Sequence, residues 1–276
     1  MSNAYNLSLA QKSFYADNGY LLLKSVFSRD EAAHFREEGH HVFNRLAAAD
    51  IKVQSQGWRS GAKITDLPRA LMSCHNVQFH SAAFTRLLTD PRLTDPIADL
   101  IGPNIQLHHT KLFIKPPEKG APFPMHQDAP YFPHTRNTMT AAIIHFDDAP
   151  LEKGCVRVMP GSHRRGQRSH DVVEGTHEHH LEVDKFPLED GVPCPAEAGD
   201  VLIFSYLMIH GSGRNESDEA RTTLLVQVRD PEDLPRVDTH VSRGQGMMLR
   251  GIDPLANSGV TVPSPRRIVA PAPNVK

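Results

Sequence analysis

The sequence predicts a mostly β protein in which a helical N-terminal flank precedes an antiparallel sandwich or barrel. Residues 1–104 carry long segments with helical patterning, whereas residues 105–230 contain short apolar runs separated by Pro, Gly, Asp and Asn. The pattern of residues 105–230 is typical of antiparallel β sandwiches and barrels. With 276 residues, of which 39% are hydrophobic and 22% charged, the chain can bury a large core. We expect one domain over 1–276, with a C-terminal extension over 231–276.

The flank is expected to open with a helix, a strand and a second helix. The segment SLAQKSFYADNG is amphipathic and ends at Gly19, and YLLLKSVF is short and apolar. Ser28 and Glu31 have the spacing of a capping box, which predicts that a helix begins there and continues over 31–50. Residues 51–75 have a mixed, loop-like composition, and the segment from Val77 to Gly102 predicts one or two further helices.

Five apolar runs beyond residue 104 predict the strands of the core, and the polar runs between them predict its turns. A polar insertion over 164–196 is long for a compact sheet, so we expect it to act as a lid or to be mobile. The Pro-rich residues after 231 are expected to be draped over the surface or frayed. The predicted strands are IQLHHTKLFIK, TAAIIHF, GCVRVMP, DVLIFSYLMIH and RTTLLVQVR.

The bulk composition argues against several classes of protein. A formal net charge of −2 gives no general basic field for nucleic acid. Three widely spaced cysteines without a CxxC pair, Cys74, Cys155 and Cys194, argue against a disulfide framework or a thiolate metal site. We therefore expect a reducing, cytoplasmic location. The N-terminus lacks the pattern of a signal peptide, and no 18 apolar residues run together, so we expect no membrane segment.

The run PFPMHQDAPYFPH places His126 and Asp128 two residues apart. A mononuclear iron site for oxygen chemistry uses two histidines and one carboxylate on one face of the metal. Residues two apart on a strand project from the same face, so this pair suits such a site. The motif alone is weak, because this composition gives about two His-x-acid pairs by chance. The sequence also holds His145 with Asp147, and His180 with Glu182.

His210 is the expected third ligand, because it closes the run VLIFSYLMIH and is followed at once by the turn residues GSGRN. We expect it to share a strand face with Phe204. His145 lies within a predicted strand and is expected to be satisfied by a backbone partner. His180 lies in a polar stretch that is typical of a solvated loop, and HEHH lacks the HExxH spacing of a metalloprotease.

The last predicted strand has one polar face, made of Arg221, Thr223, Gln227 and Arg229. A polar face on an otherwise apolar strand predicts a wet interior pocket. Arg221 in such a pocket would need an anion, and its guanidinium matches the geometry of a carboxylate.

Taken in order, six segments of the chain resemble the phytanoyl-CoA dioxygenase family of iron(II)- and 2-oxoglutarate-dependent oxygenases. The resemblance implies a double-stranded β-helix (a jelly-roll, cupin-like core) over 105–230, with the N-terminal helices packed on one sheet. The segments are FYADNGYLLLKSVFS, KLFIKPP, MHQDAPY, DDAPLEKGCVRVMPGSH, AGDVLIFSYLMIHGSGRNES and RTTLLVQVR.

The resemblance also implies roles for individual residues. His126, Asp128 and His210 would hold the iron and so carry catalysis. Arg221, helped by the hydroxyl of Ser212, would bind the distal carboxylate of 2-oxoglutarate. Three further residues are expected to line the cosubstrate pocket, namely Lys63, Lys111 and Thr110. Gln127 should point away from the metal by alternation, either to stiffen the strand or to contact substrate. The expected substrate-binding residues are Phe123, Met125, Gln127, Tyr131, Phe132, His134 and Arg229.

The implied reaction couples the oxidative decarboxylation of 2-oxoglutarate by O2 to the hydroxylation of a C–H bond, with ascorbate as a helper in vitro. Asp128 favours hydroxylation over halogenation, because related halogenases have Gly or Ala at that position. Many members carry a Trp near the position of Ile143, whereas the only Trp here is Trp58, so no known substrate is carried over. No basic cluster suits a CoA group, and we expect a small molecule, such as a natural-product intermediate or an amino-acid-like acid.

Two alternatives remain open at the level of sequence. The same three ligands could hold zinc and a bound water in a hydrolase. Alternatively, the chain could be a jelly-roll module that binds a metabolite without catalysis.

Overall fold

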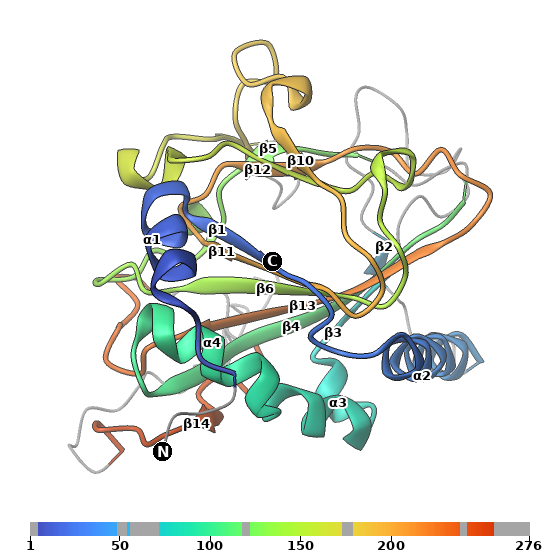
Figure 1. The fold of residues 1–276 in the computed structure, drawn as a ribbon, viewed down its shortest axis with the longest axis horizontal. Coiled ribbons are helices and arrows are strands. Elements are labelled where there is room, and N and C mark those ends of the chain that lie inside the picture. The colour runs from blue at the N-terminus through green and yellow to red at the C-terminus, as the bar shows by residue number, and fades with distance from the viewer. Residues whose placement is uncertain are drawn as a thin grey trace, which may run out of the picture.

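The computed structural model describes residues 5–48, 54–55, 72–117, 122–172, 179–237 and 242–256. Helices lie on one side of a large sheet, and a smaller sheet lies on its other side (Figure 1). The helices are α1 (Leu9–Asn18), α2 (Arg29–Ala48), α3 (Ala82–Leu88) and α4 (Pro91–Ile101).

The large sheet has eight strands among the described residues, in the order β1-β11-β6-β13-β4-β3-β2, with β14 also paired to β4. Its strands are β1 (Tyr20–Leu23), β2 (Gln54–Ser55), β3 (Met72–His75), β4 (Ile105–Lys115), β6 (Thr140–His145), β11 (Val201–Ser205), β13 (Arg221–Arg229) and β14 (Met248–Arg250).

The small sheet has the order β10-β7-β12-β5, and β8 pairs with β9 in a separate ribbon. These strands are β5 (Phe123–His126), β7 (Val156–Val158), β8 (Asp171–Val172), β9 (His179–His180), β10 (Val192–Cys194) and β12 (His210–Ser212). The two antiparallel sheets form a double-stranded β-helix, as the sequence predicted.

Helix α2 begins where the capping pattern predicted. The backbone N–H of Ser28 donates to the carboxylate of Glu31, and the N–H of Glu31 donates to the Ser28 hydroxyl. Helix α1 ends at Gly19, whose φ of 78° lies in the left-handed region that favours glycine. No helix among the described residues is long and apolar enough to cross a membrane.

Strand β13 lies at the centre of the large sheet, paired with β4 on one side and β6 on the other. Leu224, Val226 and Val228 face the helices and belong to the main hydrophobic core. The alternate residues of β13, which include Arg221 and Gln227, therefore face the small sheet, as the period-two pattern predicted. That inner space also holds a smaller apolar cluster formed by β6, β7, β10 and β11.

A bulge interrupts β4 at His108. Gln227 of β13 pairs with His109, whereas the next residue, Val228, pairs with Leu107. The extra residue leaves the ladder and shifts which residues face inward. As a result, the rings of His108 and His109 both lie against Phe132, with centroid distances of 4.7 and 5.6 Å.

The structure corrects four expectations about single segments. The run over 201–210 is not one strand, because β11 ends at Ser205 and the chain turns before β12 begins at His210 in the other sheet. Residues 72–75 form β3 rather than a loop, and β14 attaches the extension to β4. The insertion over 164–196 also supplies β10, an edge strand of the small sheet.

Candidate active site

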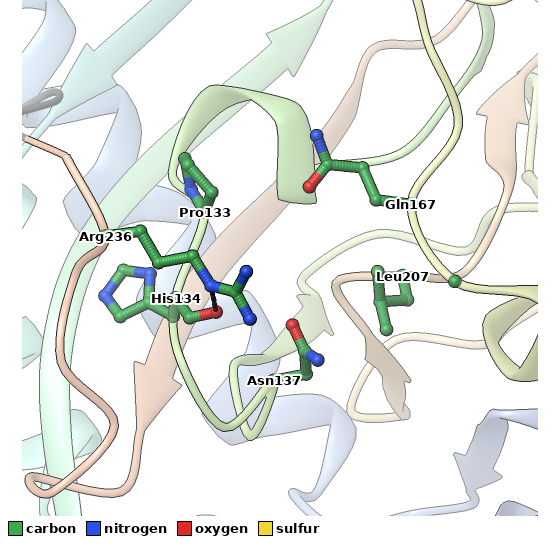
Figure 2. Close-up of a pocket in the computed structure, with 7 residues that line it drawn as sticks. Pro133, His134, Asn137, Gln167, Leu207 and Arg236 are labelled. Atoms are coloured by element: carbon green, nitrogen blue, oxygen red, sulfur yellow. Dashed lines mark hydrogen bonds between the residues drawn. The ribbon is translucent and has the colours of Figure 1, made fainter.

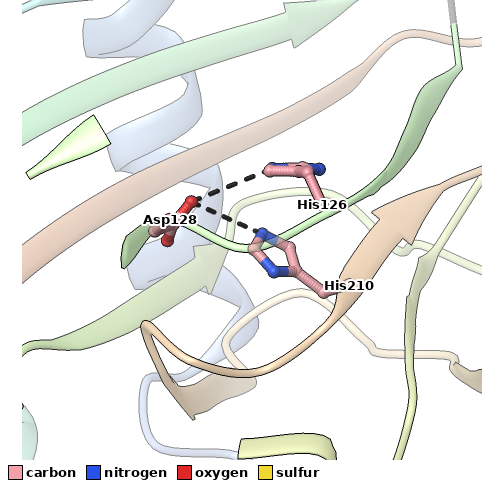
Figure 3. Close-up of side chains that lie close together, drawn as sticks. All are labelled: His126, Asp128 and His210. Carbon is pink, nitrogen blue, oxygen red and sulfur yellow. Dashed lines mark ion pairs between the residues drawn. The ribbon is translucent and has the colours of Figure 1, made fainter. Parts of the chain in front are cut away.

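His126, Asp128 and His210 lie together between the two sheets (Figure 3). Their ligand atoms all lie within 4.8 Å of one another, and each histidine Nε2 is 3.8 Å from Oδ1 of Asp128. His126 ends β5 and His210 begins β12, and the two residues are direct partners across these strands. The expectation that Asp128 lies on the same strand as His126 was wrong, because β5 ends at His126 and Asp128 precedes the 3-10 turn Ala129–Tyr131. The three side chains form one His-Asp-His facial triad.

Backbone carbonyls fix the orientation of both imidazoles. Nδ1 of His126 lies 2.8 Å from the carbonyl oxygen of Pro124, and Nδ1 of His210 lies 3.0 Å from that of Met208. A carbonyl oxygen only accepts, so each Nδ1 must carry the proton, and each Nε2 keeps its lone pair. Such contacts to the second nitrogen set the tautomer of metal-binding histidines. Both lone pairs are therefore available on the side of Asp128.

The protonation states of the triad fit a divalent metal. Burial lowers the pKa of His126 and of His210 to about 4, so both rings are neutral at pH 7. Burial also raises the pKa of Asp128, and the hydrogen bond from Gln227 and the charge of Lys111 offset this only in part. A metal ion needs neutral imidazoles and a carboxylate, and its charge would compensate this buried anion. Two imidazoles and one carboxylate are the ligand set of non-heme iron(II) oxygenases.

Gln227 holds the second oxygen of Asp128. Its Nε2 donates to Oδ2 of Asp128 at 3.0 Å, while Oδ1 is the atom that faces both histidines. Gln227 is almost fully buried on the inner face of β13. The sequence placed it on the polar face of this strand but gave it no role. The structure identifies it as the residue that orients the carboxylate ligand.

A pair of buried cations lies further along β13 and β4. Arg221 and Lys115 are direct partners across these two strands, and they are 5% and 0% exposed. Nζ of Lys115 donates to the hydroxyl of Ser212 at 2.8 Å and to the carbonyl of Gly213 at 2.5 Å. Arg221 donates to the carbonyl of Gly154. Arg221 and Ser212 therefore both lie next to Lys115, and their role in binding 2-oxoglutarate stays a prediction.

Neither cation makes an ion pair within the described ranges, and Nε of Arg221 has no hydrogen-bond partner there. Burial lowers the pKa of Arg221 to about 10. Burial, followed by the charge of Arg221, holds the pKa of Lys115 well below its usual value. Two adjacent buried cations without an anion are costly, so the pocket suits a negatively charged ligand. Sequence reasoning missed Lys115 and considered only Lys63, Lys111 and Thr110 here.

A histidine from β6 completes the inner face beside this pair. His145 lies opposite Thr223, with its Nδ1 3.3 Å from the carbonyl oxygen of Asp200. The expected backbone partner is therefore present. Burial and then the charge of Arg221 lower the pKa of His145 to about 4, so the ring is neutral beside the two cations.

Other residues expected at the cosubstrate pocket lie in different places. Lys111 is on the inner face, where its charge acts on Asp128 and its Nζ lies 4.8 Å from the ring centre of Phe113. Thr110 faces the helices instead, and its hydroxyl bonds to Gln78 and to the backbone N–H of Val77. Thr110 is therefore outside the pocket. Lys63 falls outside the described residues.

Two residues expected to contact substrate point away from the metal. Met125 packs with Leu181 and Ile209 in a cluster beneath the insertion. The amide of Gln127 donates to the carbonyls of Gly166 and Leu207, and its oxygen accepts from the N–H of Arg168. Gln127 points away from the metal, as alternation predicted. Its amide forms hydrogen bonds with the backbone of the insertion, at Gly166 and Arg168.

The insertion contacts the metal-binding segment directly. The N–H of Leu181 donates to the carbonyl of Met125, and the N–H of Gln127 donates to Nε2 of His170. A surface pocket of about 160 Å³ opens between the insertion and the 133–137 turn (Figure 2). Gly166 and Leu207, whose carbonyls accept from the amide of Gln127, line this pocket.

Four of the remaining expected substrate residues lie on the other side of the triad from Arg221, and Phe123 does not. Phe132 follows the 3-10 turn that Asp128 begins, and His134 lies 5.8 Å from His108, measured between ring centres. Arg229 lies two residues beyond Gln227 on β13 and is fully buried. Tyr131 is half-buried and packs on Phe132. Phe123 lies at the opposite end, 5.4 Å from Nζ of Lys115.

Comparison with known proteins agrees with this geometry. The family model for phytanoyl-CoA dioxygenase (PhyH) matches residues 15–223. The peroxisomal phytanoyl-CoA dioxygenase of Bos taurus is 30% identical over 237 residues, covering 81% of this chain and 69% of that protein. A probable alpha-ketoglutarate-dependent hypophosphite dioxygenase of Stutzerimonas stutzeri is 28% identical over 222 residues, covering 78% and 76%.

A solved structure shows the same fold. The non-heme alpha ketoglutarate dependent carbocyclase SnoK from nogalamycin biosynthesis matches with a TM-score of 0.68 at 20% identity, covering 88% of this chain and 95% of that one. The family model covers far more than half of the chain and includes all three metal ligands as well as Arg221. This chain belongs to the phytanoyl-CoA dioxygenase family and is an iron- and 2-oxoglutarate-dependent dioxygenase.

Proposed function

We propose that this protein hydroxylates an aliphatic C–H bond of a small polar metabolite and releases succinate and carbon dioxide from 2-oxoglutarate. The observation that carries the proposal is the distance between the triad and the buried cations. His210 and Ser212 are two residues apart on β12, and in this ladder they project to the same side, about 7 Å apart. Ser212 is bonded to Lys115, which lies opposite Arg221. A five-carbon dicarboxylate has the length to join the two sites.

The chain's own residues then have separate tasks. Arg221, Lys115 and Ser212 bind the distal carboxylate of 2-oxoglutarate, and this contact sets the orientation of its keto-acid end toward the triad. Gln227 keeps Oδ1 of Asp128 directed at the metal position. Iron(II), when bound with 2-oxoglutarate, supplies the activation of O2 that oxidises the substrate.

The carboxylate at position 128 supports hydroxylation over halogenation. Oδ1 of Asp128 is directed at the same point as both imidazoles, and Gln227 holds it there. The protein therefore supplies three ligands and does not leave the third position to a halide. We infer that the oxidised carbon receives oxygen.

The substrate is proposed to be small and polar. The side of the triad away from Arg221 is lined by His108, His134 and Arg229 as well as by Phe132. Such a lining suits a molecule with its own polar groups better than an unbranched hydrocarbon chain. The relatives named above act on substrates as different as an acyl-CoA and hypophosphite, so the family alone does not select one.

The proposal is tested by anaerobic addition of 2-oxoglutarate to the iron(II)-loaded protein. A visible metal-to-ligand charge-transfer band is expected, and oxygen with ascorbate should then give succinate that increases when a metabolite pool is added. A zinc hydrolase would give neither signal. A metabolite-binding module would bind pool components without succinate release. The matched control is His210→Ala, which should lose iron, the band and succinate formation together.

A further inference from the structure

A second buried guanidinium, Arg229, has one edge without a partner among the described residues. Its Nη1 donates to the carbonyls of Asp230, Pro231 and Asp233, at 3.1, 3.0 and 2.6 Å. Its Nε and Nη2 have no hydrogen-bond partner, although the side chain is fully buried. Because Nη1 is fixed by three carbonyls, the guanidinium cannot turn to satisfy the other edge. Nε and Nη2 together form the fork that binds an oxyanion through two parallel hydrogen bonds.

His134 supplies a second buried polar atom without a partner among the described residues. Its Nδ1 lies 2.7 Å from the carbonyl of Phe132, so Nδ1 carries the proton and Nε2 is an acceptor. Nε2 has no partner within the described part of the chain, and His134 is 1% exposed. His134 pairs with Pro235 in an isolated β-bridge, and Pro235 follows the loop whose Asp233 carbonyl accepts from Arg229. A buried donor and a buried acceptor therefore lie on segments that contact each other.

The acidic residues around Arg229 are occupied by other donors. The carboxylate of Asp233 accepts from the backbone N–H groups of Arg136 and Thr138 and from the Thr138 hydroxyl. The carboxylate of Asp230 accepts from the N–H of Glu232. Neither lies within ion-pair distance of Arg229. The negative charges of these carboxylates lower the free-energy cost of burying Arg229. Among the described residues, no carboxylate accepts a hydrogen bond from its Nε or Nη2.

The position of this edge relative to the triad fits a substrate. Gln227, which holds Asp128, lies two residues before Arg229 on the same face of β13, about 7 Å away along the strand. Phe132 lies four residues after Asp128 and packs on His108, which in turn lies against His134. A molecule bound at Arg229 would therefore extend along this wall toward the metal, from the side opposite to 2-oxoglutarate.

We propose that the substrate is a small oxyacid whose carboxylate or phosphonate binds the Nε/Nη2 edge of Arg229, and whose adjacent O–H or N–H donates to Nε2 of His134. This inference deepens the proposed function and rests on it. It assigns a ligand class to the distal end of the pocket, namely an anion with a neighbouring donor.

The test uses glycolate and hydroxymethylphosphonate as probes, with glycolamide as the neutral control. Iron(II) protein saturated with 2-oxoglutarate is titrated anaerobically, so that Arg221 and Lys115 are already occupied. We expect at least one of the two anions to shift the charge-transfer band with at least tenfold higher affinity than glycolamide. Which anion binds better distinguishes a carboxylate from a phosphonate substrate. No preference for either anion over glycolamide would overturn the inference.

Paired variants locate the binding. Arg229→Lys keeps a cation that can bond to the loop carbonyls but lacks the fork, and should weaken binding of the preferred anion at least tenfold. The parent protein should bind glycolate more tightly than acetate, which lacks the neighbouring O–H. His134→Asn keeps a donor for the Phe132 carbonyl but removes the acceptor, and should abolish this preference. His134→Gln places its amide oxygen near the former position of Nε2 and should restore part of the preference for glycolate over acetate. Unchanged affinities in both Arg229→Lys and His134→Asn contradict the assignment.

The failure of this inference differs from the failure of the proposed function. If the band forms in every variant but anions show no preference, only the substrate class is wrong. If no band forms at all, the proposed function fails. Calorimetry of the same anions on the metal-free protein with saturating 2-oxoglutarate then decides whether Arg229 binds them.

Discussion

Strand β13 carries a buried guanidinium at each end, and the surroundings of the two are very different. Arg221 donates to a single carbonyl, that of Gly154, and has the cation Lys115 as its partner across the ladder. Arg229 donates to three carbonyls of the turn that follows the strand, and aspartates surround it. Burial lowers the pKa of both groups. The charges of Cys155 and Asp147 oppose that effect at Arg221, and those of Asp233, Asp253 and Asp230 oppose it at Arg229.

The difference shows that burial alone does not define the task of an arginine. The neighbouring cation Lys115 raises the free-energy cost of burying the charge of Arg221. Binding of an anion therefore stabilises the protein more at Arg221 than at Arg229. Arg229 is largely satisfied by its own loop, so it serves the fold first and offers only one edge to a ligand. Four sets of substitutions would break or sharpen this comparison.

The largest effect is expected at Arg221. Arg221→Met should raise the dissociation constant of 2-oxoglutarate at least about 30-fold, because losing one partner of a buried charge pair costs about 2–5 kcal/mol. Iron binding should not change. The free energy of unfolding should stay the same or rise, since the variant loses an uncompensated buried cation. Anaerobic titration and urea denaturation measure the two quantities. An unchanged affinity for 2-oxoglutarate would contradict the assignment of Arg221 to the cosubstrate site.

The matching substitution at the other end should give the opposite pattern. Arg229→Met should lower the free energy of unfolding by about 3 kcal/mol, because three loop carbonyls lose a charged donor inside the protein. The affinity for 2-oxoglutarate should not change in the folded fraction. Urea denaturation provides the measurement. If Arg229→Met were as stable as the parent protein, the two ends would not differ as described.

Between the two ends, Gln227 tests the metal ligand. Gln227→Leu should weaken iron(II) binding about tenfold, as loss of a hydrogen bond to a ligating carboxylate commonly does. Thr223→Val is the matched control, because Thr223 lies on the same inner face and has no contact with Asp128 among the described residues. Competition with a colorimetric chelator measures the affinity. Equal losses in both variants would mean that Gln227 acts only through packing.

The smallest effects are expected around Lys115. Lys115→Met should weaken 2-oxoglutarate about tenfold and Ser212→Ala about threefold, because a charged hydrogen bond contributes more than a neutral one. The pKa of Lys115 is lowered, and its protonated form binds the anion better. The affinity of the parent protein should therefore fall as pH rises, and Lys115→Met should flatten that profile. Calorimetry over a pH series is the measurement, and a profile that is identical in the variant would contradict the role of this lysine.

Local spacing in the sequence predicted the elements that depend on neighbours in the chain. The capping pair Ser28 and Glu31 marked the start of α2, and the alternation over 221–229 gave both faces of β13. The residue types and the spacing of His126 and Asp128 indicated the metal site. These features follow from contacts within a few residues, or from the period of a strand, so they can be read without the fold.

Only the tertiary structure decided which residues lie beside Arg221. Strict alternation from Leu107 along β4 would turn Lys115 toward the helices, but the bulge at His108 reverses the phase and brings Lys115 beside Arg221. The same shift turns Thr110 out of the pocket. The change of apolar phase, from Ile105 and Leu107 to Leu112 and Ile114, was the signal in the sequence.

The sequence by itself thus determined the types of metal ligand, the polar face of β13 and the positions of the main strands along the chain, because these depend on local period and spacing. The tertiary structure decided the crossing from β11 to β12 and the partners of Arg221 and Arg229. These depend on register between strands that lie far apart in the chain, and a shift of one residue there exchanges the two faces of a strand.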